Sequence, residues 1–179
     1  GRLDDAIKSY RAALAVNPVF ATAHSNLGAA LKELGRLEDA VTSLQRAIEL
    51  NPDLAIAHNN LGNVLKDQGR MDDAVASYRK AIALNPEESK AHDNLGLALQ
   101  RMGRLQDAVE CHDKAVSLDP DDAKAHASLG LALHEMDRLE EALASYDKAI
   151  TLTPDYAEAL GNRGITLHEL GRLEEAIAC

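Results

Sequence analysis

Apolar residues recur along the chain at three- and four-residue steps, which is the spacing of one helical face. Residues 55–88 contain two such series, Ala57, Leu61, Val64, Leu65 and then Met71, Ala74, Val75, Tyr78, Ala81, Ile82. Gly69 separates them and suits the left-handed residue that follows a helix, and Asp72 and Asp73 favour the positive end of the next helix. Asn85 ends the second series, because a residue before proline avoids helical geometry. The segment therefore predicts two helices, A and B, joined by a tight turn.

The same pattern returns every 34 residues along the whole sequence. All five prolines share one position of the repeat: Pro18, Pro52, Pro86, Pro120 and Pro154. A fixed period of this length indicates an array in which each unit buries its apolar face against its neighbours. The predicted organisation is a single array over 1–179: helix B of a partial repeat (1–20), full repeats (21–54, 55–88, 89–122, 123–156) and a partial repeat (157–179). It contains five A helices, five complete B helices and part of a sixth.

Glycine recurs inside helix A, although it costs about 1 kcal/mol there relative to alanine. The positions are Gly28, Gly62, Gly96, Gly130 and Gly164. We expect a B helix to lie directly against each glycine, where a larger side chain would not fit.

Composition narrows the class of protein. Aromatic residues make up only 3% and tryptophan is absent, so the core must consist mainly of Ala, Leu, Val and Ile. The net charge of −10 argues against nucleic acid as the partner, and no apolar run approaches the ~20 residues of a membrane span. Cys111 and Cys179 lie two repeats apart, too far for a disulfide, which favours a reducing, cytoplasmic location. The sequence reads as a fragment without its native termini.

The repeat resembles the tetratricopeptide repeat (TPR), whose pattern is W-x2-L-G-x2-Y, then A-x3-F, then P. The corresponding residues of one repeat are His58, Leu61, Gly62, Leu65, Ala74, Tyr78 and Pro86. The resemblance covers the whole chain. It implies an all-α fold, a right-handed solenoid superhelix of antiparallel helix pairs whose A helices line a concave groove for proteins or peptides. Leu160 and Arg163 depart from the pattern, which implies different packing in the last repeat.

Asparagine recurs at the sixth position of helix A, as Asn26, Asn60, Asn94 and Asn162, with Ser128 in the remaining repeat. Asparagine is a mediocre helix former, but its amide both donates and accepts hydrogen bonds, as an extended peptide backbone requires. The pattern looks like the asparagine ladder of the TPR superhelices in O-GlcNAc transferases and SPINDLY-type proteins. That resemblance implies that the four asparagines hold a protein substrate. The alternative interpretation is a solvated face inherited through repeat duplication.

Other positions of the predicted groove suggest what it would bind. Its charged residues are Lys32, Glu33, Lys66, Asp67, Lys90, Asp93, Arg101, Lys124, Glu135, Glu158 and Glu169, five positive against six negative. A nearly neutral groove suits a polar peptide of mixed sequence. Its ninth position changes from Ala29 and Asn63 to Leu97, Leu131 and Ile165, which predicts a more apolar second half. The predicted peptide-binding residues are Asn26, Asn60, Asn94, Asn162, Asn63, Lys90, Lys124, Leu97, Leu131 and His134.

Two other functions remain open. A TPR carboxylate clamp in the register Asn59, Asn63, Asn94, Lys124, Ser128 lacks two of the cations that grip a C-terminal carboxylate. A structural spacer, or a module that associates end to end, is favoured by terminal faces without polar caps.

Catalytic and metal chemistry are not expected. No nucleophile, phosphate-loop or zinc motif is found, so we predict no enzyme activity, cofactor or metal. His24, His58, His92 and His126 recur one repeat apart, about 10 Å by helix spacing, too far to share a zinc ion. We expect each to be a half-buried packing group with one bonded ring nitrogen, and His112 to be structural as well.

Overall fold

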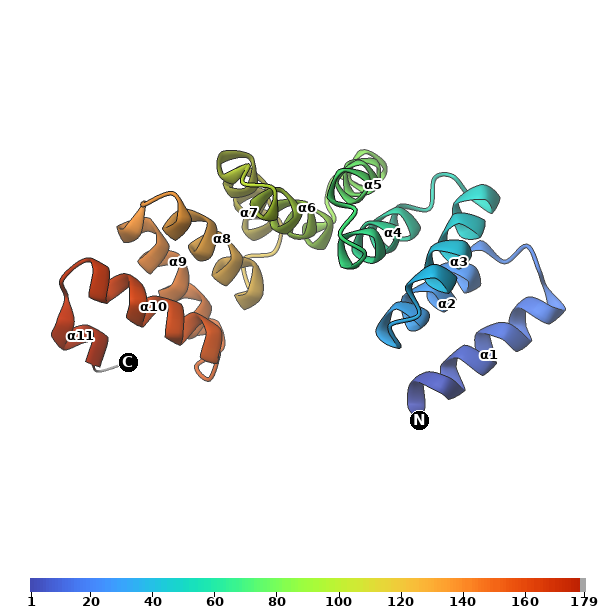
Figure 1. Cartoon of the computed structure of the whole chain (residues 1–179), viewed down its shortest axis with the longest axis horizontal. Helices are drawn as coiled ribbons and strands as arrows, with labels where there is room; N and C mark the ends of the chain where they lie inside the picture. Colours follow the sequence, from blue (N-terminus) through green and yellow to red (C-terminus); the bar gives the residue numbers. More distant parts are fainter. Residues whose placement is uncertain (178–179) are drawn as a thin grey trace. The chain divides into compact units, whose positions relative to one another are not determined.

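The computed structural model describes residues 1–177, which form eleven helices (Figure 1). These are α1 (Arg2–Val16), α2 (Ala21–Glu33), α3 (Leu37–Leu50), α4 (Ala55–Asp67), α5 (Met71–Leu84), α6 (Ser89–Arg101), α7 (Leu105–Leu118), α8 (Ala123–Glu135), α9 (Leu139–Leu152), α10 (Ala157–Glu169) and α11 (Leu173–Ile177). The even-numbered helices are the predicted A helices and the odd-numbered ones the B helices. The all-α fold and the antiparallel helix pairs are confirmed. Cys179 lies outside the described residues.

The chain divides into two compact units, Gly1–Glu87 with α1–α5 and a second that begins at Glu88 and holds α6–α11. In the first unit each helix packs against the next, and α2 also contacts α4. In the second unit α8 likewise contacts both α6 and α10. Among the described residues, consecutive B helices of a unit make no such contact. Consecutive A helices of one unit therefore lie side by side and share a surface, which we call the A-helix face. A single continuous superhelix stays a prediction.

The turn from helix A to helix B depends on a left-handed residue, as predicted. Gly69 has φ +77°, and the same position in the fourth full repeat holds Asp137 with φ 60°. The Gly69 N–H donates to the carbonyl of Lys66 and the Arg70 N–H to that of Leu65, which satisfies carbonyl groups at the end of α4. Aspartate replaces glycine here because it tolerates this conformation better than most residues.

The repeated glycine allows the two helices of a pair to approach closely. A Cβ atom on Gly62 would lie 2.5 Å from Cε1 of Tyr78, and one on Gly28 would lie 2.5 Å from Cγ of Leu44. Gly96 and Gly130 are covered in the same way by B-helix side chains. The expectation is not tested for Gly164, because the covering side chain lies 16 residues after the glycine in the other repeats and the sequence ends at Cys179.

The repeated histidine forms a hydrogen bond with the backbone carbonyl of the repeated proline. Nε2 of His58 lies 2.9 Å from the carbonyl oxygen of Pro52, six residues earlier. His24 and His126 make the same contact with the carbonyls of Pro18 and Pro120, both at 3.0 Å. For these three residues the predicted ring hydrogen bond is confirmed. It fixes the start of each A helix to the turn before it.

Candidate functional site

Three predicted binding residues of the first unit, Asn26, Asn60 and Asn63, line one pocket. Asn26 belongs to α2, and the other two belong to its neighbour α4. The pocket has a volume of about 320 Å³, and side chains of α1 form its remaining wall. We call it the amide pocket. It lies on the A-helix face because α2 and α4 both contribute to it.

The amides of this pocket have unused hydrogen-bonding capacity. Asn26 is half-buried and has no hydrogen-bond partner among residues 1–177. Nδ2 of Asn60 makes only a long contact of 3.4 Å with Oγ of Ser25. Asn63 accepts a hydrogen bond of 2.8 Å from the Tyr78 hydroxyl, which leaves its NH₂ group available. An amide can donate twice and accept twice, so these groups can hold further polar atoms.

The charges at the edge of the amide pocket offset one another. Nζ of Lys32 lies 3.4 Å from carboxylate oxygens of both Glu33 and Asp67. Burial lowers the pKa of Lys32, but the two carboxylates more than compensate, so the pKa is raised and the ammonium stays charged. Lys32 therefore presents little uncompensated charge to a ligand.

A second pocket, in the second unit, brings together Leu131, His134 and Asn162, three further predicted residues. Glu135, Tyr146 and Ile165 complete its lining, and its volume is about 260 Å³. We call it the tyrosine pocket, because the fully buried Tyr146 contributes to its wall. Nε2 of His134 lies 3.0 Å from Oε2 of Glu169 on α10, although the two atoms are not aligned for a hydrogen bond.

The remaining predicted residues lie on α6 and α8 and line neither pocket. Asn94 and Leu97 are half-buried, whereas Lys90 and Lys124 are exposed near the starts of their helices. Ser128, the interruption in the asparagine series, is buried. A row of amides that continues from one unit to the other stays a prediction.

The prediction that Asp93 contributes a charge to the groove is wrong. Asp93 is buried, and its Oδ1 lies 2.9 Å from Nδ1 of His112, which is fully buried. The ring of His112 covers Gly96, as Tyr78 covers Gly62. His112 thus has the structural position predicted for it, and Asp93 is its buried partner rather than a contact for a ligand.

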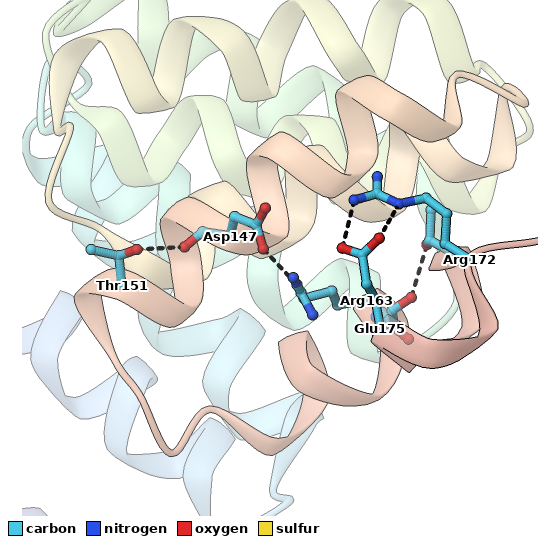
Figure 2. A network of polar contacts seen from close by, with 7 residues as sticks. Asp147, Thr151, Arg163, Arg172 and Glu175 are labelled. Carbon is cyan, nitrogen blue, oxygen red and sulfur yellow. Dashed lines mark hydrogen bonds and ion pairs between the residues drawn. The ribbon is translucent and has the colours of Figure 1, made fainter. Parts of the chain in front are cut away.

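Arg163 explains the departure of the last repeat. Leucine at this position is buried in α2, α6 and α8. In α10, Arg163 turns instead toward the carboxylate of Asp147 on α9, and Figure 2 shows this pair near the Arg172–Glu175 pair. Thr151 donates to the backbone carbonyl of Asp147 at 2.7 Å. An ion pair replaces apolar packing here, which confirms that the last repeat packs differently.

Sequence reasoning missed the contact between Tyr78 and Asn63 and its absence at Tyr146. The signal was present, because the same two positions read Asn and Tyr in one repeat and Leu131 and Tyr146 in another. Recognising it required knowing that these positions touch.

Within residues 1–177, no group of three or more His, Cys, Asp or Glu side chains is arranged to hold a metal ion. The helices of the same residues include none with the length and apolar character needed to cross a bilayer.

Family comparisons agree with the geometry. One model, described as TPR repeat, matches residues 1–35, 30–69 and 62–103. Two models described as tetratricopeptide repeat match residues 94–157 and 145–178. No curated protein sequence matches the chain significantly.

Solved structures with the same fold include YrrB, described as a TPR protein with an unusual peptide-binding site. It is 25% identical, with a TM-score of 0.77, over 96% of this chain and 89% of that chain. MamA is 29% identical, with a TM-score of 0.75, over 87% and 91%. A segment of MamA from Desulfovibrio magneticus RS-1 is 25% identical, with a TM-score of 0.75, over 88% and 89%. The closer resemblance to O-GlcNAc transferases stays a prediction. With repeat models matching from residue 1 to residue 178, the chain belongs to the tetratricopeptide repeat family.

Proposed function

We propose that this protein is a non-enzymatic binding module that holds an extended polypeptide on its A-helix face. The observation that carries the proposal is the amide pocket, where Asn26, Asn60 and Asn63 converge from two neighbouring A helices. The peptide-binding site named for YrrB supports binding of the same class of ligand. The proposed partner is a protein segment in extended conformation.

The spacing of the amides fits a peptide backbone. Packed helices lie about 8–10 Å apart, and an extended peptide advances about 3.3 Å per residue. Asn26 and Asn60 occupy the same position of adjacent repeats, so each would meet the peptide about three residues from the other. Amides that bond backbone N–H and C=O groups do not depend on the ligand's side chains. The module is therefore expected to accept mixed sequences.

The double variant Asn26→Ala/Asn60→Ala tests the proposal. Peptides would be selected from a phage-displayed library of random 12-residue sequences, and their affinities measured by fluorescence anisotropy. Loss of two to four hydrogen bonds, each worth about 0.5–1.5 kcal/mol, predicts binding weaker by about 5-fold or more. The melting temperature should stay nearly unchanged, because Asn26 has no partner and Asn60 only the contact with Ser25. Gln45→Ala, which removes an exposed amide from α3, is the matched control and should bind normally.

Two chemical modifications of the peptide distinguish recognition of its backbone from a carboxylate clamp on its C-terminus. N-methylation of single peptide bonds should weaken binding at about every third position if amides grip the backbone. Amidation of the peptide's C-terminus should have no effect, whereas a carboxylate clamp predicts loss of binding. Unchanged affinity in the double variant would contradict the proposal and favour the solvated face, with a spacer or self-associating module as the remaining function.

A further inference from the structure

Two tyrosines occupy the same position of two B helices but make different contacts. Tyr78 on α5 and Tyr146 on α9 are both fully buried, and each ring lies against the glycine of its own repeat, Gly62 or Gly130. The Tyr78 hydroxyl donates to Oδ1 of Asn63 at 2.8 Å. Its hydrogen-bonding requirement is thus met within the repeat.

Tyr146 lacks this partner. The position that corresponds to Asn63 is Leu131, which has no polar atom in its side chain. The Tyr146 hydroxyl is buried and has no hydrogen-bond partner among the described residues. Buried polar groups without a partner are rare in folded proteins, because they have lost water and gained nothing in return. The side chain that carries this hydroxyl is one of those that line the tyrosine pocket, so a guest in the pocket lies beside Tyr146.

The surroundings define the group that would satisfy the hydroxyl. Burial raises the pKa of Tyr146, and the charges of Glu135 and Glu158 add to this effect, so the phenol remains a hydrogen-bond donor. It therefore needs an acceptor. A carboxylate is disfavoured because Glu135 lines the same pocket, which leaves a neutral oxygen.

The pocket has room for a side chain. Its volume of about 260 Å³ is below the ~300–1,000 Å³ typical of sites for drug-sized molecules. Leu131 and Ile165 supply apolar walls, and Asn162 and His134 supply polar groups. A guest with an apolar stem and a neutral amide tip matches this lining.

We propose that the tyrosine pocket binds the carboxamide of a glutamine side chain from the bound peptide. The amide oxygen accepts from the Tyr146 hydroxyl, as Asn63 does for Tyr78. The NH₂ group faces Glu135 and Asn162, and the two methylene groups pack between Leu131 and Ile165. This inference rests on the proposed function and adds selectivity to it: the backbone is held by amides, and one residue is chosen by this pocket.

The test uses 13-residue Gly/Ser peptides that differ only in a central guest residue: glutamine, glutamate or norleucine. Binding to the full chain would be measured by fluorescence anisotropy. The glutamine peptide should bind about 5-fold tighter than the norleucine peptide, as one added hydrogen bond predicts, and the glutamate peptide should bind no better than norleucine. Tyr146→Phe should abolish the preference. Leu131→Asn should abolish it too, because the introduced amide takes the phenol for itself.

Tyr78→Phe is the matched control, since it removes the corresponding hydroxyl from the first unit, and it should keep the preference for glutamine. Equal affinities for all guests in the unmodified protein, or a preference that survives Tyr146→Phe, would overturn the inference. If all guests bind equally and Asn26→Ala/Asn60→Ala still weakens them, the proposed function stands while this inference fails. If no extended peptide binds, both fail.

Discussion

At the scale of single residues, the repeats act as internal controls for one another. Tyr78 and Tyr146 have the same burial and the same glycine beneath the ring, and they differ in whether the hydroxyl has a partner. Such a comparison isolates one hydrogen bond in one protein. Where Asn63 of one repeat is replaced by Leu131 in another, the tyrosine hydroxyl is left without a partner among the described residues.

This comparison predicts opposite effects of the same substitution on stability. Tyr78→Phe breaks a hydrogen bond and should lower the free energy of unfolding by about 0.5–1.5 kcal/mol. Tyr146→Phe removes a buried hydroxyl without a partner and should leave the free energy unchanged or raise it by up to about 1 kcal/mol. Urea unfolding followed by circular dichroism measures both. Equal losses in the two variants would mean that the Tyr146 hydroxyl has a partner after all.

Asp93 and His112 show what residue patterns alone could reveal. The position of Asp93 is Ser25, Asn59, Ala127 or Gly161 in the other repeats, and His112 replaces the tyrosine or leucine found elsewhere on the B helices. The two departures occur in the same repeat, and the two residues touch. Sequence placed Asp93 in the groove, since helical position indicates a face but not which neighbour the side chain reaches.

At the scale of helices, the pair A–B depends on glycine in helix A to bring the two backbones together. Gly62 meets the buried ring of Tyr78, whereas a Cβ atom on Gly161 of α10 would meet nothing within 4 Å. Glycine at both positions carries the same cost in helix propensity. Only the first of them recovers that cost through close packing.

The two glycines should therefore respond differently to alanine. Gly62→Ala places a methyl group against a ring that cannot move aside, and a loss of about 1–3 kcal/mol is expected from overpacking. Gly161→Ala should raise the free energy of unfolding by about 0.5–1 kcal/mol, because alanine is the better helix former, has room and already occupies the same position of α8 as Ala127. Thermal unfolding of both variants checks this. Stabilisation by Gly62→Ala would contradict the packing described for α4 and α5.

Helix boundaries were predictable because glycine, proline and acidic residues mark them locally. As predicted, Gly69 follows the end of α4, Asp72 lies in the first turn of α5, and Asn85 follows the last residue of α5. The pockets were less predictable. Asn26 and Asn60 could be placed on one face from the period alone, but the participation of α1 and α9 side chains depends on packing between helices.

At the scale of the whole molecule, the 34-residue period determines most of the architecture. Each of the two compact units is built from repeats of one helix pair. Within a unit, contact between successive A helices places corresponding residues of neighbouring repeats beside one another. Residues 34 positions apart in sequence, such as Asn26 and Asn60, thereby reach one pocket. Binding by this protein is thus a property of the array, because no single repeat contains the amide pocket.

The central claim is that the side-chain amides of Asn26 and Asn60 bind the peptide directly. The most direct measurement follows their NH₂ resonances in ¹H–¹⁵N NMR spectra while a selected peptide is added. We predict that the NH₂ resonances of both asparagines shift during the titration, and that these shifts give the same dissociation constant as the backbone signals of α2 and α4. The NH₂ resonances of Gln45 on α3 should stay in place. Asparagine resonances that remain unchanged while the peptide binds elsewhere would contradict the account.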